Sequence, residues 1–194
     1  MVRRRITIAL ILIFVAAIAG CVSNGDIGTA IEKWNKVADK TQEIRLLDEQ
    51  LGKTMKADNV IIEPELAKDT PNLEKFLPIL DKWQKTLDEE RKILEEKSSL
   101  ISDFAGSTVN LDGDAKRYGD SALKNTRESN RYETSSIDNF NRGIESLRTC
   151  FKILDKTSCS QSEQYFNAAD SDTIKSNSYV DEANDDMKKL EALQ

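Results

Sequence analysis

The chain has 194 residues, and its 28 basic and 34 acidic side chains give a formal net charge of −6. It contains no histidine, which removes histidine-based catalytic triads, imidazole zinc sites and the Glu-x-x-His di-iron sites of many helical bundles. The negative charge argues against nucleic acid as a partner, because a surface of that sign repels a phosphate backbone.

The first twenty-one residues have the pattern of an export signal. Three arginines occupy positions 3–5, residues 6–19 are apolar except for one threonine, and one small residue, Gly20, follows before Cys21. A membrane-spanning helix needs about 20 apolar residues, so this run is too short to favour an uncleaved anchor. A cleaved signal peptide is the favoured interpretation, with a signal anchor as its alternative.

Residues 18–21, with the sequence Ile-Ala-Gly-Cys, resemble the lipobox of prokaryotic lipoproteins. The resemblance covers residues 1–21 only. It implies that the signal peptide, residues 1–20, is removed and that Cys21 becomes the lipidated first residue. The protein would then be attached to a membrane through this lipid and would face outward, into a periplasm or from the cell surface.

The remaining chain has the composition of a single helical domain. Glycine and proline are scarce, and charged residues make up 32% of the sequence, which is typical of long exposed helices. Residues 21–28 are rich in small and polar side chains and are expected to form a tether. The helical domain is therefore predicted over residues 29–194.

The first predicted helix covers residues 29–57, where apolar residues recur three or four positions apart with charges between them. Residues 59–70 interrupt this spacing with three consecutive apolar residues and Pro64. We therefore expect a connection over 59–70 that contains at most one helical turn.

The second predicted helix has the most regular apolar pattern of the chain. Thr70 is expected to cap it, with Pro71 in its first turn, and Pro78 is expected to kink it. Glu90 and Lys97 alone interrupt the three-four alternation, which is otherwise formed by Leu73, Phe76, Leu80, Trp83, Leu87, Leu94, Ile101 and Phe104.

The third periodic segment covers residues 111–154 and has small and polar residues in the middle of its apolar stripe. A helix of that length would extend for roughly 60 Å, so a break near Gly119 or Gly143 is expected. The last helix is predicted to begin at Ser160, because residues 160–163, Ser-Gln-Ser-Glu, fit a capping box.

Four helices with short connections predict an all-α fold, an elongated antiparallel four-helix bundle that resembles a coiled coil. The alternative is a three-helix coiled coil whose first helix is free. The apolar pattern of the helices is also compatible with a homo-oligomer.

Cys150 and Cys159 are nine residues apart across the predicted turn between the last two helices. In an exported protein this spacing predicts a disulfide that pins the helical hairpin. The alternative is a pair of free thiols, because Cys150 lies on the apolar stripe.

One small polar stretch of the third segment is the candidate for a ligand cleft, formed by Tyr118, Asn125, Ser129 and Tyr132. A large residue of a facing helix, such as Trp34 or Trp83, would line its other side. The favoured alternative is that small residues allow close helix packing while polar groups bond to one another or to water.

The sequence offers no convincing catalytic residues, and we expect no metal or cofactor. Ser121 and Lys124 have the Ser-x-x-Lys spacing of penicillin-binding enzymes, but the companion motifs are missing. The acidic pairs near residues 112 and 170 do not fit a calcium loop and are expected to lie at helix starts.

These features predict a non-enzymatic, membrane-attached helical protein of the cell envelope, which binds another envelope protein or serves as a structural element. A sensory bundle that binds a small molecule outside the cytoplasm is the second hypothesis. An enzyme ranks third.

Overall fold

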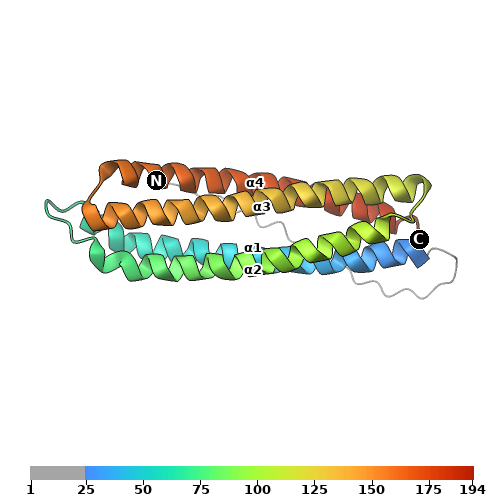
Figure 1. Cartoon of the computed structure of the whole chain (residues 1–194), viewed down its shortest axis with the longest axis horizontal. Coiled ribbons are helices and arrows are strands. Elements are labelled where there is room, and N and C mark those ends of the chain that lie inside the picture. Colours follow the sequence, from blue (N-terminus) through green and yellow to red (C-terminus); the bar gives the residue numbers. More distant parts are fainter. Residues whose placement is uncertain (1–24) are drawn as a thin grey trace.

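The structure is a computed structural model that describes residues 25–194. Within that range the chain forms four long α-helices and one short 3-10 helix: α1 (Gly25–Leu66), η1 (Glu74–Phe76), α2 (Leu77–Thr108), α3 (Gly113–Ile153) and α4 (Lys156–Glu191). The helices run side by side in alternating directions, which confirms the elongated antiparallel four-helix bundle (Figure 1). The predicted signal peptide and Cys21 lie outside the described residues, whereas residues 25–28, predicted to belong to the tether, form the start of α1.

Two hairpins make up the two layers of this rod. The α1–α2 hairpin forms one layer and the α3–α4 hairpin forms the other, with α2 packed against α3 (Figure 1). The start of α1, the α2–α3 connection and the C-terminus lie at one end. The α1–α2 and α3–α4 connections lie at the opposite end, which we call the distal end. None of the helices described is long and apolar enough to cross a membrane.

The apolar core is divided along the rod. One cluster, near the start of α1, joins all four helices through residues that include Trp34, Phe104, Leu123 and Met187. A second cluster at the distal end includes Leu51, Trp83, Phe140 and Phe151. Between them lies only a small apolar group, Ile44, Leu94 and Ile137, so the middle of the bundle is filled in large part by polar residues.

Helix α1 continues to Leu66, so the predicted connection over 59–70 is wrong for its first eight residues. Ile62 is buried in the distal cluster, and Pro64 lies in the last turn. The carboxylate of Glu65 holds the following chain: it accepts a hydrogen bond from the Asn72 backbone N–H at 3.1 Å and ion-pairs with Lys68 and Lys75. Tertiary contacts therefore extend the helix beyond its regular sequence pattern.

Helix α2 begins at Leu77, after the 3-10 turn, and not at Thr70. Pro78 consequently lies in the first turn of α2, where its missing N–H has no helical acceptor to lose. The predicted cap at Thr70 and the predicted kink at Pro78 are both wrong. The regular spacing across Pro78 arises because the 3-10 turn keeps Leu73 and Phe76 on the buried side.

Helix α3 is continuous over 41 residues, so the break predicted near Gly119 or Gly143 is absent. Both glycines lie at close contacts. A Cβ atom at Gly119 would lie 2.7 Å from Leu111 Cδ1, and one at Gly143 would lie 2.5 Å from the Phe166 ring. Glycine fits these positions because of tight packing, most strictly at Gly143, where the neighbour is an aromatic ring, and not because of a bend.

Helix α4 begins at Lys156, one turn before the predicted start at Ser160. Asp155 is its N-cap and accepts hydrogen bonds from the backbone N–H groups of Thr157 and Ser158. The bonds from Ser158 and Thr157 lower the pKa of Asp155. The predicted disulfide between Cys150 and Cys159 is confirmed, with 5.1 Å between the two Cα atoms.

Candidate functional site

Polar and charged side chains from all four helices meet midway along the rod, between the two large apolar clusters. We call this set the polar centre. It consists of Arg45 and Asp48 of α1, Glu90 and Lys97 of α2, Ser129, Glu133 and Ser136 of α3, and Thr173, Ser176 and Asn177 of α4.

A buried ion pair between α2 and α3 dominates the electrostatics of the polar centre. Lys97 is 1% exposed and Glu133 is 9% exposed. Lys97 Nζ donates to Glu133 Oε2 at 2.6 Å. Burial lowers the pKa of Lys97, and the attraction of Glu133 opposes this shift. Because two charges have left water, each one needs the other to remain in the core.

Hydroxyl groups extend this ion pair into the seam between α3 and α4. Ser176 Oγ donates to Glu133 Oε1 at 3.3 Å, and Ser129 Oγ lies 2.9 Å from Ser176 Oγ. Since the Ser176 proton is directed at the carboxylate, Ser129 is the donor in the serine pair. One connected network therefore links Lys97 on α2 to both helices of the other hairpin.

The same seam continues one turn further along. Ser136 Oγ lies 3.0 Å from the Ala169 carbonyl oxygen and 2.8 Å from Thr173 Oγ1. On the other side of the centre, Arg45 Nε donates to Asn177 Oδ1 at 3.1 Å, which connects α1 to α4. The hydrogen bonds of the polar centre thus join α2 to α3, α3 to α4 and α1 to α4.

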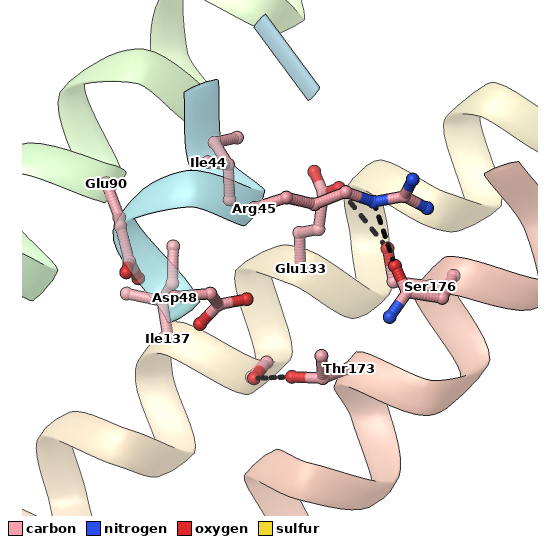
Figure 2. Close-up of a pocket in the computed structure, with 10 residues that line it drawn as sticks. Ile44, Arg45, Asp48, Glu90, Glu133, Ile137, Thr173 and Ser176 are labelled. Carbon is pink, nitrogen blue, oxygen red and sulfur yellow. Dashed lines mark hydrogen bonds between the residues drawn. The ribbon is translucent and has the colours of Figure 1, made fainter. Parts of the chain in front are cut away.

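A small cavity lies within the polar centre (Figure 2). Its volume is about 20 Å³ and its walls include Arg45, Asp48, Glu90, Glu133 and Ser176. This space accommodates about one water molecule. Figure 2 shows Arg45 extending across it from α1 toward α4. An organic substrate or ligand would need side chains or helices to move before it could enter.

The arrangement therefore joins four helices around a cavity that accommodates about one water molecule in this conformation. Ser176 contacts a carboxylate, yet that carboxylate is engaged by Lys97 and the hydroxyl is buried. A nucleophilic serine needs an attacked atom within reach, and a cavity that fits one water does not supply that space.

The residues of the predicted ligand cleft are spread along the α3–α4 seam. Tyr118 and Tyr132 are 14 residues apart on one helix, or about 21 Å along its axis. Between them, Asn125 is buried and Ser129 takes part in the hydrogen-bond network.

Cationic side chains cover both tyrosine rings. Arg131 lies 4.5 Å from the ring centre of Tyr132, and Arg117 lies 4.8 Å from that of Tyr118. Tyr132 also stacks on Tyr179 of α4, with 5.7 Å between ring centres.

The two tryptophans lie in different apolar clusters, so they do not line one cleft together. Trp34 packs against Phe104 with 5.6 Å between ring centres. Trp83 lies in the distal cluster, and its indole N–H donates to Asp58 at 2.8 Å. Both side chains contribute buried aromatic area to the core.

Ser121 and Lys124 both lie on α3, where Ser121 is half-buried and Lys124 is exposed. Within residues 25–194 there is no group of three or more cysteine, aspartate or glutamate side chains arranged to hold a metal ion.

Sequence reasoning did not identify the polar centre as a whole, although Ser129 was singled out within the polar stretch of α3 and two charged residues of α2 also gave a signal. Glu90 and Lys97 occupy apolar positions of the α2 pattern with opposite charges, and both are almost completely buried. A charge at such a position requires a partner from another helix. The sequence does not indicate that Glu133 is the partner of Lys97, because Glu133 lies in a segment with many exposed charges.

Residues 25–194 thus define an antiparallel four-helix bundle with a buried polar centre. Comparisons with protein families, with curated proteins and with solved structures found no match to this chain. Its fold and site therefore rest on its own sequence and geometry.

Proposed function

We propose that this chain is an exported lipoprotein, anchored to a membrane by lipid on Cys21 and acting outside the cytoplasm as a non-enzymatic interaction or structural protein of the cell envelope. The observation that carries the proposal is the order of a basic head, a short apolar run and Ile-Ala-Gly-Cys at residues 18–21.

The disulfide between Cys150 and Cys159 supports the proposed compartment. Disulfides persist in exported proteins and are rare in the reducing cytosol of mesophiles. The acidic surface supports solubility close to a membrane, because negative charge limits unspecific adhesion to anionic lipid.

The form of the bundle supports an interaction or structural role over the sensory alternative. Polar groups of the centre bond to one another across helices, and the cavity accommodates about one water molecule. A small-molecule sensor needs a pocket several times larger. Long helices with exposed side chains instead offer an extended surface for another protein.

The decisive experiment is the intact mass of the chain isolated from a membrane fraction, before and after reduction. The expected result is a chain that begins at Cys21, carries additional lipid mass and gains two hydrogens on reduction. A Cys21→Ser variant is the matched control and should lack the lipid. A full-length chain that begins at Met1 would contradict the lipoprotein proposal and indicate a signal anchor.

The interaction role needs a separate measurement. Crosslinking in intact envelopes should attach the wild-type chain to a defined protein, which includes another copy of itself. A chain that remains monomeric and uncrosslinked would contradict the role. A compound that stabilises the bundle in a thermal-shift screen would favour the sensory alternative.

A further inference from the structure

Large exposed apolar side chains gather at the distal end of the rod. Most of those on residues 25–194 lie beside its two chain reversals. They are Val60, Ile61 and Leu66 at the end of α1, and Ile153 and Leu154 between α3 and α4. These five side chains keep between 47% and 71% of their area exposed, so that apolar area is available to another molecule.

The α3–α4 reversal presents its two apolar residues, Ile153 at the end of α3 and Leu154 directly after it, inside a disulfide-closed segment. Cys150 and Cys159 close this segment, and Cys150 is buried in the distal cluster. Leu154 has a φ of 53°, a left-handed conformation that helices usually give to glycine at this position. A disulfide across this segment limits the conformations of the free chain, and a segment with fewer free conformations loses less entropy on association.

The two reversals carry opposite charge. Residues 152–156 contain two lysines and one aspartate, and that aspartate caps α4. Residues 58–75 contain five acids and two lysines, and both of those lysines are engaged by Glu65. An apolar patch with basic surroundings therefore lies next to an apolar patch with acidic surroundings on the same end of the molecule.

We propose that the distal end binds the distal end of a second copy of this chain. In Figure 1 the α3–α4 layer lies above the α1–α2 layer. A twofold rotation about an axis between the layers, perpendicular to the page, places the α3–α4 reversal of each copy against the α1–α2 reversal of the other. The basic α3–α4 reversal of each copy then faces the acidic α1–α2 reversal of the other. Because the two copies use the same surface, this favourable pairing occurs twice.

The charge pattern also distinguishes this occupant from a lipid surface. The acidic α1–α2 reversal would be repelled by anionic head groups, whereas it attracts the basic reversal of another copy. The contact involves few side chains on each copy, far fewer than the 20–30 residues a side of a stable interface. The dimer is accordingly weak and reversible.

In this dimer the starts of the two α1 helices lie at opposite outer ends. With a lipid anchor near each outer end, the dimer would join two membrane surfaces. That consequence rests on the proposed function, while the dimer itself does not, and a failure to dimerise would leave the intact-mass test of lipidation unaffected.

The first test compares the full chain with two single variants by sedimentation velocity over a wide range of concentrations in one mild detergent. Ile153→Asp changes a distal residue that is 69% exposed, and Ile174→Asp changes a residue on the side of α4 that is 70% exposed. We expect at least a tenfold rise in the dimer dissociation constant for Ile153→Asp and less than a twofold change for Ile174→Asp, with unchanged circular dichroism in both.

A charge exchange tests the pairing of the two reversals. One variant carries Lys152→Glu and Lys156→Glu, and the other carries Glu63→Lys and Asp69→Lys. Each variant alone should be monomeric, because like charges then face each other at both contacts. An equal mixture of the two should dimerise, because every contact again pairs opposite charges.

Several results would overturn the proposal. These are a monomeric wild type at all concentrations, a dimer that Ile153→Asp leaves intact, equal losses in Ile153→Asp and Ile174→Asp, or a mixture of the charge variants that stays monomeric. Co-sedimentation of the wild type with anionic phospholipid vesicles, lost in Ile153→Asp, would assign the distal end to a membrane instead.

Discussion

The two hairpins of the bundle are packed with side chains of different size. The α1–α2 hairpin buries large residues, such as Ile44, Leu80, Trp83 and Leu87. The α3–α4 seam buries a small residue at every seventh position: Ala115, Ala122, Ser129, Ser136 and Gly143 on α3, and Ser162, Ala169, Ser176 and Ala183 on α4. As a result, α3 and α4 approach each other more closely than α1 and α2 do.

This difference shows how one heptad spacing produces two kinds of contact. Large apolar residues separate α1 from α2 and derive their stability from buried area. Small residues bring the backbones of α3 and α4 together and allow serine hydroxyls to bond across the seam. The α1–α2 contact should be destabilised most by substitutions that remove side-chain volume, and the α3–α4 contact by substitutions that add it.

The largest effect is expected where the two hairpins are joined by charge. Lys97→Met should destabilise the fold by about 3 to 5 kcal/mol, because Glu133 would be left buried without its cationic partner. Urea unfolding measures this loss. The matched control is Lys97→Met combined with Glu133→Gln, which should recover most of the stability. A double variant no better than the single one would show that the ion pair is not the cause.

A reciprocal pair of substitutions tests the contrast in side-chain size. Leu80→Ala, in the α1–α2 hairpin, should cost about 2 to 5 kcal/mol through lost burial and a residual cavity. Ala183→Leu, in the α3–α4 seam, should cost about 1 to 3 kcal/mol through overpacking. Both sites are fully buried. If Ala183→Leu left the free energy of unfolding unchanged, the close packing of α3 against α4 would be contradicted.

Two glycine substitutions should change stability in opposite directions. Gly106→Ala on α2 should stabilise the protein by about 0.5 to 1 kcal/mol, because alanine favours the helix and a Cβ atom there has no neighbour within 4 Å. Gly143→Ala on α3 should destabilise it by about 1 to 3 kcal/mol, because the new Cβ atom would meet the Phe166 ring. Thermal unfolding of both variants checks the difference in sign.

The smallest expected effect is a dependence of stability on pH at the end of α1. Lys68, Lys75 and the Asn72 N–H lower the pKa of Glu65 from 4.5 to about 2. Its contribution is fully present above pH 4.5 and is lost as the pH falls from 4.5 toward 2, because the unfolded chain takes up the proton first. Glu65→Gln should flatten the pH dependence of unfolding in that window. An unchanged pH profile would contradict the assigned ion pairs.

The general fold could be predicted from the sequence because it depends on periodic burial. Apolar residues at three-four spacing in α2, such as Leu80 and Leu87, specify a helix with one buried face wherever it packs. The spacing of Cys150 and Cys159 across a turn likewise favoured a bridge between them over a pair of free thiols. These features are local or periodic, and they appear directly in the order of residues.

Helix ends were predicted less well, because they depend on contacts that the local pattern does not contain. Ser160 begins a plausible capping box, but Asp155 caps α4 because its carboxylate reaches two free N–H groups at the start of the helix. Helix α1 likewise extends past Asn59 because Ile62 finds a place in the distal cluster.

The sequence by itself determined the class of fold and the four long helices and predicted the disulfide, because hydrophobic periodicity and short connections restrict how such a chain can bury its apolar face. Only the tertiary structure decided which buried charges meet and which glycines carry the close contacts. Those outcomes depend on the register between helices, as in the pairing of Lys97 with Glu133, and register is set when all four helices pack together.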